Sequence, residues 1–489
     1  MKNNTICLFL CLVLVFTQTA CKRMIDPSFN ASGYPPAIEK IVVKKCATSG
    51  CHNDISYTNA GNLNLTTWDN MMKGAVNGSV VIPYSPKQSS LLQFVNTYSD
   101  LGVTISPSMP LNASPLSRED VLVIRDWIQH GCPDVNGKIP FDDNYANRPK
   151  TYLTNQGCDL VSIIDVESQL VMRYVSVGHD PNQVELPHNV KVSPDGRYWY
   201  VCFSNGAYFQ KFDSRTDQLV QEVNITQGLW NVVKISGDGN LAYISDLTNN
   251  GRIVVVDLVQ MKVKATYSGS GLLIFPHGIA LSQTGDTIYA TAQYGNMIYR
   301  IIPALPQIDA ISLQPGQPPV TTAQLLDPHE VIMSPDYSKY FVTCQTSNEV
   351  RVMDARTDTL LKVIPVGIWP LEFAISKNQN LLFVTCQEDQ NPVYPFFRGS
   401  IYVIDMNTLT VVHKIYEKFF QPHGLAVHEG SSLLFVGSRN ADPNGPAPHH
   451  VSECAGRNGF YHAIDILNWQ SKRPASEVSV DPYSMDIKQ

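Results

Sequence analysis

The feature that most constrains the fold is an internal repeat in the later part of the chain. A short apolar strand opening with Pro-His or a variant is followed by a Ser-Pro-Asp-Gly-like turn, an aromatic-rich strand and an apolar strand ending in Asp. The units start, 42 to 52 residues apart, at Pro187, Leu229, Pro276, Pro328, Pro370 and Pro422. Because one such unit cannot bury its own faces, neighbouring units must stack against each other.

The two ends of this region each hold part of a further unit. Residues 152–175 supply the later strands without a first strand, whereas residues 482–487 supply a first strand without followers. Joined, they complete a seventh unit, in which 482–487 closes the first blade. Four-stranded units at this spacing predict an all-β, seven-bladed β-propeller over residues 149–489, since ring closure removes exposed sheet edges.

Two stretches also carry a family resemblance. Tyr152-Leu153-Thr154-Asn155 with residues 161–165, and Phe341-Val342-Thr343 with residues 352–354, resemble the YVTN family of propeller repeats. The resemblance implies the same seven-bladed architecture. Function does not follow from it, because this fold carries many activities.

Four histidines share one position of the repeat, at the start of the strand expected nearest the central channel. They are His188, His277, His329 and His423. We expect them to form part of a ring that could hold copper or another transition metal, or act as acid and base on a substrate. Alternatively, histidine simply suits this turn and bonds a neighbouring carbonyl. Glu330 and Glu372, each beside the ring, are candidate partners of the histidines or merely solvated.

Ahead of the repeats, residues 36–52 combine a predicted helix with two cysteines and a histidine. Pro36 suits a helix start, and the helix leads to Cys46, followed by Cys51 and His52. Covalent haem attachment needs two thiols for the vinyl groups and a histidine directly after the second as proximal iron ligand. Four residues rather than the usual two separate the cysteines. A Cys46–Cys51 disulfide and a zinc site with further ligands are the alternatives.

A sixth iron ligand is expected later in the same segment. Met109 lies in a proline-flanked loop just before a predicted helix that opens at Ser117 with a capping pattern. We therefore expect Met109 to be the distal ligand. The alternatives are that Met109 only fills the core, or that Met71, Met72 or His130 takes its place.

Residues 45–53, 61–65, 72–74 and 106–110 together resemble the single-haem c-type cytochrome domains of exported Bacteroidetes and planctomycete proteins, in a CxxxxCH variant. The resemblance covers residues 33–140 and implies that Met109 is the usual distal ligand. The expected fold class is therefore two domains: a small all-α cytochrome c-like domain at 36–140, followed by the propeller.

The first residues read as an export signal. Lys2 precedes an apolar run too short to span a bilayer permanently, so residues 1–20 are expected to be removed. The run ends before Cys21 in a pattern that resembles a bacterial lipoprotein cleavage box, although Gln18 replaces the usual aliphatic residue, and the resemblance implies that Cys21 carries lipid and residues 21–35 form a tether. The alternative is an ordinary signal peptide in which Cys21 is incidental. The protein is expected in the periplasm or cell envelope, anchored to a membrane.

Charge limits the partners. With 43 acidic and 36 basic residues the net charge is -7, which gives no basic footprint for nucleic acid. We expect a redox protein whose haem c exchanges electrons with a partner protein, the propeller serving as substrate-binding or catalytic module of a periplasmic oxidoreductase. The alternatives are a non-enzymatic lipoprotein whose propeller recognises a protein or glycan, and a metal-assisted lyase similar to the streptogramin lyases. Whether the protein is an enzyme stays open.

Overall fold

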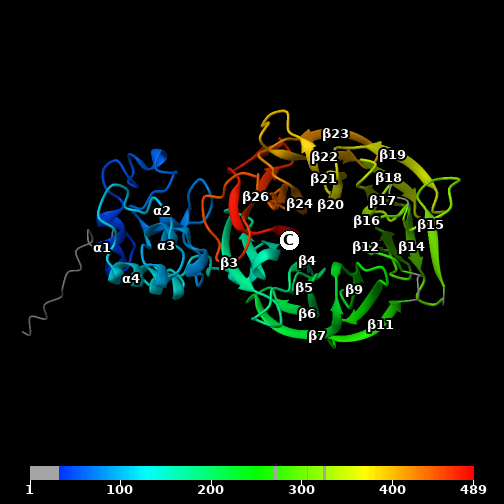
Figure 1. Ribbon diagram of the computed structural model, residues 1–489, viewed down its shortest axis with the longest axis horizontal. Coiled ribbons are helices and arrows are strands. Elements are labelled where there is room, and N and C mark those ends of the chain that lie inside the picture. The colour runs from blue at the N-terminus through cyan, green and yellow to red at the C-terminus, as the bar shows by residue number, and fades with distance from the viewer. Residues whose placement is uncertain (1–31, 269–272, 306, 323–325) are drawn as a thin grey trace, which may run out of the picture.

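A computed structural model describes residues 32–268, 273–305, 307–322 and 326–489 (Figure 1). The expected signal at 1–20 and the lipid site at Cys21 lie outside the described residues, as does most of the tether at 21–35. Within the described residues, no helix combines the length and the apolar character that a membrane crossing requires.

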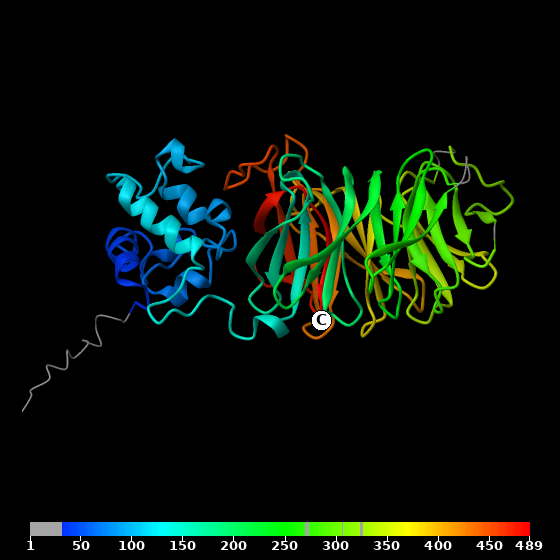
Figure 2. The same cartoon turned by 90° about the horizontal axis from the view of Figure 1, so that it is seen from below.

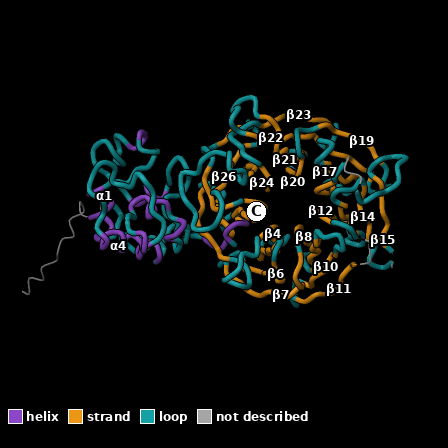
Figure 3. Tube along the Cα trace, in the orientation of Figure 1, coloured by secondary structure: helices purple, strands orange, loops and turns teal. Residues whose placement is uncertain are grey.

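Most of the described chain is a ring of antiparallel sheets (Figures 1 and 3). The first two sheets are β29 (Pro482–Lys488), β1 (Lys150–Asn155), β2 (Leu160–Asp165) and β3 (Leu170–Ser176), then β4 (Pro187–Val192), β5 (Tyr198–Phe203), β6 (Gly206–Asp213) and β7 (Gln218–Gly228). The next two are β8 (Trp230–Ile235), β9 (Leu241–Asp246), β10 (Arg252–Asp257) and β11 (Lys262–Ser268), then β12 (Pro276–Leu281), β13 (Ile288–Ala292), β14 (Met297–Ile301) and β15 (Ile308–Ser312).

The remaining three sheets follow the same pattern. They are β16 (Pro328–Met333), β17 (Lys339–Cys344), β18 (Glu349–Asp354) and β19 (Leu360–Pro365), then β20 (Pro370–Ser376), β21 (Leu381–Gln390), β22 (Arg398–Asp405) and β23 (Thr410–Ile415), then β24 (Pro422–His428), β25 (Leu433–Ser438), β26 (Asn458–Asp465) and β27 (Gln470–Ser471), with β28 (Ser476–Val480) also paired to β26. The seven-bladed propeller predicted from the repeat is confirmed.

The first strand of each unit lies innermost, around the centre of the ring (Figure 1). Each inner strand contacts the inner strand of the next blade, and β29 lies between β24 and β4. Strand β29 pairs with β1, with Thr151 opposite Ile487 and Leu153 opposite Met485. The predicted closing strand therefore joins the first blade and completes the ring.

The repeated aspartates explain how the outer hairpins turn. Asp165 accepts a hydrogen bond from the backbone N–H of Ser168 at 2.8 Å, and Asp405 accepts one from that of Asn407 at 2.8 Å. Short side chains that bond nearby backbone N–H groups stabilise tight turns. One residue type at a fixed repeat position thus ends the third strand of blade after blade.

The expected separate all-α domain at 36–140 is wrong. The part of the chain before the propeller has four short α-helices: α1 (Pro36–Lys45), α2 (Trp68–Met72), α3 (Ser90–Val95) and α4 (Arg118–Gln129). Short 3₁₀ turns lie at Tyr57–Asn59, Pro86–Gln88, Ser99–Leu101 and Tyr145–Asn147, with another between β1 and β2 at Gln156–Cys158. Loops rich in proline, glycine and asparagine form the rest, because such residues interrupt helices. The chain as a whole is nearly all β.

This N-terminal segment also lies directly against the propeller, beside β3 and β26 (Figures 1 and 2). Ser79 Oγ donates to the carbonyl of Val171 at 2.8 Å, and the backbone N–H of Glu477 donates to the carbonyl of Asn77 at 3.0 Å. Lys87 pairs with Glu453 at 2.8 Å. Polar contacts therefore join the segment to the first and last blades.

Candidate functional site

A cleft with a volume of about 410 Å³ lies in the N-terminal segment and is partly walled by the propeller. Its lining includes apolar side chains of α3 and of the loops before it, such as Leu63, Val80, Leu91 and Phe94. Cavities of this size with apolar walls and a few polar groups are typical of cofactor and small-molecule sites.

Cys46, Cys51 and His52 all line this cleft. Helix α1 ends at Lys45, and the next residue, Cys46, donates its backbone N–H to the carbonyl of Val42. The N–H of His52 donates to the carbonyl of Cys46 at 3.2 Å. This short loop brings both thiols and the imidazole to one wall. Burial, with the nearby Cys51 as a smaller cause, raises the pKa of the Cys46 thiol to about 11.

Two alternatives for these cysteines were a Cys46–Cys51 disulfide and a zinc site, and the described residues form neither. Cys46 and Cys51 are both free thiols, so the disulfide is absent. The described residues place no group of three or more metal-ligating side chains around Cys46. The three residues thus remain available to a ligand in the cleft.

The ring of His52 is held by the backbone. Its Nδ1 lies 3.1 Å from the carbonyl oxygen of Leu63, and since a carbonyl only accepts, Nδ1 carries the proton. Burial lowers the pKa of His52, which favours the neutral ring. The unshared pair of Nε2 is therefore free to bind a metal.

Met109 lines the same cleft, and its backbone N–H donates to the carbonyl of Phe94 at 2.7 Å. Of the alternatives, Met71 is buried in the core around α1 and α4, while Met72 and His130 are absent from the cleft lining. Met109 is thus the sequence-predicted candidate that the structure brings into one cavity with His52.

The propeller supplies two further lining residues that sequence reasoning did not place here. His449 and His450 come from the loop between β25 and β26. Their backbone N–H groups donate to the Glu477 carboxylate at 2.8 and 2.9 Å. The ring of His449 lies 5.0 Å from that of Phe94. Phe94 and His449 lie 355 positions apart in the sequence (449 − 94), so no local signal could have joined the two walls.

A disulfide anchors the same loop. Cys454 pairs with Cys158, which lies in the turn between β1 and β2, across a sequence separation of 296 residues. Cysteine count and export allowed disulfides but did not identify this pair. The bridge fixes the loop that carries His449 and His450 to the first blade.

The four repeat histidines lie where the repeat places them, each the second residue of an inner strand: β4, β12, β16 and β24. All four are buried. The ring centroids of His277 and His329 are 4.0 Å apart, and those of His329 and His423 are 6.0 Å apart. Tyr483 lies between His423 and His188, at 3.8 and 4.2 Å from them.

Backbone carbonyls of the following blade orient two of these rings. Nδ1 of His277 lies 3.0 Å from the carbonyl oxygen of His329, and Nδ1 of His423 lies 3.0 Å from that of Tyr483. Such a bond is what the purely structural interpretation requires, and it also fixes the ring tautomer in metal ligands. Burial lowers the pKa of His277 to about 4 and that of His423 well below its usual value, which keeps both rings neutral.

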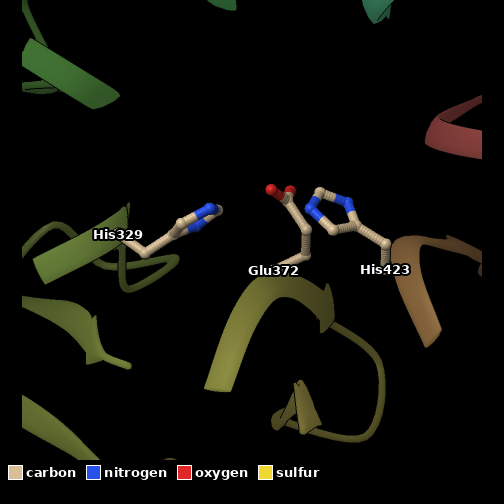
Figure 4. Close-up of side chains that lie close together, drawn as sticks. All are labelled: His329, Glu372 and His423. Atoms are coloured by element: carbon tan, nitrogen blue, oxygen red, sulfur yellow. The ribbon is translucent and has the colours of Figure 1, made fainter. Parts of the chain in front are cut away.

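Glu372 completes a compact group with two of the histidines. His329, Glu372 and His423 each offer one potential ligand atom, and these three atoms lie within 4.8 Å of one another. The carboxylate of Glu372 points between the two imidazoles (Figure 4). Burial raises the pKa of Glu372, and burial together with the charge of Glu372 raises that of Glu330. The sequence left Glu372 as either a partner of the histidines or a solvated carboxylate, whereas the structure places it among the candidate ligands.

The fold and these two sites define a seven-bladed β-propeller with a cofactor-sized cleft at its rim and a histidine-lined channel. No family model matches the chain. It is 21% identical over 299 residues to Antigen Lp49 of Leptospira interrogans, an alignment that covers 58% of the chain and 61% of that protein. The chain thus spans about three fifths of the length of this relative.

Two solved structures resemble the fold. A functionally unknown protein from Desulfotomaculum acetoxidans superposes with a TM-score of 0.51 at 13% identity, covering 69% of this chain and 98% of that one. The Kuenenia stuttgartiensis hydrazine synthase superposes with a TM-score of 0.48 at 16% identity, covering 64% and 92%. At these identities the first likeness shows the propeller fold alone.

Proposed function

We propose that the protein transfers electrons through a haem held covalently in the cleft of the N-terminal segment. The observation that carries the proposal is that Cys46, Cys51, His52 and Met109 line one cavity. Two free thiols, a histidine and a methionine are the groups that covalent attachment and axial ligation of haem require.

The cleft fits such a group by its chemistry. Its wall is mainly apolar, which suits a macrocycle, and His52 keeps Nε2 free because Leu63 accepts the proton of Nδ1. Cys46 and Cys51 would bind the vinyl carbons, His52 and Met109 would supply ligands to the iron, and the apolar side chains would exclude water. A haem so held takes up and releases single electrons.

The loop with His449 and His450 gives the propeller a part in this function. Both side chains lie at the cleft, and Glu477 of β28 fixes their backbone. A haem in the cleft would thus contact the propeller directly, and the propeller would serve as the module that binds the substrate or partner. We place this activity outside the cytoplasm, with Cys21 as lipid anchor and a redox protein as partner, because of the export signal pattern at residues 1–20.

The test is the pyridine haemochrome spectrum of the full chain, produced in a host that matures c-type cytochromes. Wild type is expected to carry one covalent haem per chain, resistant to acid–acetone extraction. Cys51→Ser should leave a haem attached by one bond, which shifts the haemochrome absorption, and the double variant Cys46→Ser/Cys51→Ser should lose covalent haem. A matched control is Cys344→Ala, which removes a buried free thiol of the propeller. Wild-type protein without covalent haem would refute the proposal.

A further inference from the structure

The channel of the propeller holds a second group of side chains that the haem does not use. His329, Glu372 and His423 come from three successive inner strands, β16, β20 and β24, and converge on one point (Figure 4). The two histidines are buried and the glutamate is partly exposed. Three blades thus contribute one potential ligand each.

The two imidazoles differ in their hydrogen bonds. Because the Tyr483 carbonyl accepts the Nδ1 proton of His423, the Nε2 of His423 is left with its unshared pair. His329 is 4% exposed, and its Nδ1 has no hydrogen-bond partner among the described residues, although the Leu371 carbonyl lies near enough to oppose the lowering of its pKa.

The donor atoms determine which metal ions this group would bind. Two imidazole nitrogens with one carboxylate suit divalent first-row transition metals, whereas calcium and magnesium prefer oxygen donors alone. Donor atoms bound to one zinc ion at about 2.1 Å lie roughly 3 to 4 Å apart. The three ligand atoms already lie within 4.8 Å of one another. Side-chain rotations that move these atoms by about an ångström bring them to that spacing.

Charged groups of both signs surround this point. Glu330 lies near enough for the charge of Glu372 to contribute to its raised pKa, and Lys191 acts on both carboxyl groups. The guanidinium of Arg439 is paired through Nε with Asp481 at 2.7 Å and lies over the ring of Tyr483. The positions of the three donor atoms, rather than the local charge, therefore favour a cation here.

We propose that His329, Glu372 and His423 bind one divalent transition-metal ion at the centre of the propeller, where Glu372 is partly exposed. The site is independent of the haem: it lies in a different part of the molecule and shares no residue with the cleft. Three protein ligands with open positions are the arrangement of catalytic rather than structural metal sites.

Isothermal titration of the metal-stripped full chain with Zn²⁺ tests the proposal, because zinc is counted separately from haem iron. Wild type is expected to bind one Zn²⁺ per chain. Glu372→Gln and His423→Gln are each expected to weaken that binding by more than about 100-fold, the upper range for loss of residues that only support a ligand. Glu372→Gln is the first choice, since it keeps the shape of a partly exposed side chain.

The matched control is His462→Gln, which changes a buried histidine of β26 outside the ring and should bind Zn²⁺ like wild type. Circular dichroism and the unfolding midpoint without metal establish that each variant is folded. Failure of wild type to bind Zn²⁺, or unchanged binding in both folded variants, would overturn the proposal. Loss of haem in the thiol variants leaves it intact, so the two proposals fail separately.

Discussion

The Nζ of Lys150 lies 2.7 Å from Oδ2 of Asp217, and both side chains are almost completely buried, at 0% and 2% exposure. Lys150 belongs to β1 and Asp217 to the turn between β6 and β7, so the pair joins the first blade to the second. Tyr152 and Trp199 also donate to the other oxygen of Asp217, at 3.0 and 2.9 Å. Tyr145 donates to Oδ2 at 2.7 Å as well, so one carboxylate accepts hydrogen bonds from four side chains.

Replacement of Asp217 by Ala is expected to lower the free energy of unfolding by about 3–5 kcal/mol, because it leaves an uncompensated buried ammonium. Urea unfolding followed by tryptophan fluorescence measures this change. The double variant Lys150→Met/Asp217→Leu should recover only the part of the loss that comes from the unpaired ammonium, because the donors of Tyr152 and Trp199 stay without an acceptor. The exposed pair Arg118–Asp100 is the control, and Asp100→Asn should leave the unfolding midpoint unchanged.

Acidification should destabilise the propeller in part through His462. This residue is 2% exposed, its Nε2 has no partner among the described residues, and burial lowers its pKa from 6.5 to about 3. Between pH 6.5 and 3 the unfolded chain therefore binds a proton at this histidine and the folded chain does not. The free energy of unfolding is highest above pH 6.5 and falls as the pH decreases toward 3. The loss approaches about 1.4 kcal/mol per pH unit within this window.

In His462→Leu the free energy of unfolding is expected to depend less steeply on pH between 6.5 and 4 than in wild type. Denaturant unfolding at a series of pH values measures the two slopes. Above pH 7 the curves should differ by a constant only. Parallel curves over the whole range would contradict this prediction.

Met109 gives a prediction about the proposed haem site. In Met109→Ala the reduction potential is expected to fall, because methionine ligation raises the potential of haem iron relative to nitrogen or oxygen ligands. Spectroelectrochemical titration measures the potential. Met72→Ala is the control, since Met72 packs nearby against the core without lining the cleft. An equal shift in both variants would argue against ligation by Met109.

The disulfide Cys158–Cys454 should stabilise the loop that carries His449 and His450. In Cys158→Ser/Cys454→Ser, amide hydrogen exchange is expected to accelerate between residues 440 and 457, with a stability loss of about 2–4 kcal/mol. Mass-spectrometric exchange resolves the loop from the remaining blades. If exchange in this loop were unchanged, the contacts of Glu477 would suffice to hold it.

Strand β29 is expected to be essential for a closed ring. A chain truncated after Asp481 loses the strand that pairs with β1 and contacts both β24 and β4, so two blades would expose apolar faces. We expect loss of a single cooperative transition and a tendency to aggregate, measured by scanning calorimetry and light scattering. A truncated chain that is monomeric with an unchanged midpoint would contradict the closure.

Features that repeat could be predicted from the sequence. The Pro-His starts, the aspartates that end third strands and the split first unit placed seven blades and the ring histidines, because each depends on contacts within one unit or between neighbouring units. The helices ending at Lys45 and Gln129 were predictable from their apolar stripes and caps. The all-α interpretation failed between them, where loops follow no period.

Contacts between distant segments could not be predicted. His449 and His450 reach the cleft, and Cys454 reaches Cys158, only because the ring brings the seventh blade beside the first. Glu372 is set one residue beyond the histidine position of its repeat, so no pattern distinguished a ligand from a solvated carboxylate. Such relationships depend on the closed ring rather than on local sequence.

The cleft is walled both by residues near Cys46 and by His449 and His450. The N-terminal segment and the loop between β25 and β26 are therefore both needed to form the cleft, and neither can be replaced alone. A protein engineer who grafted residues 32–149 onto another propeller would leave one side of the cleft missing. A useful chimaera would need to carry the loop between β25 and β26 along with the helices.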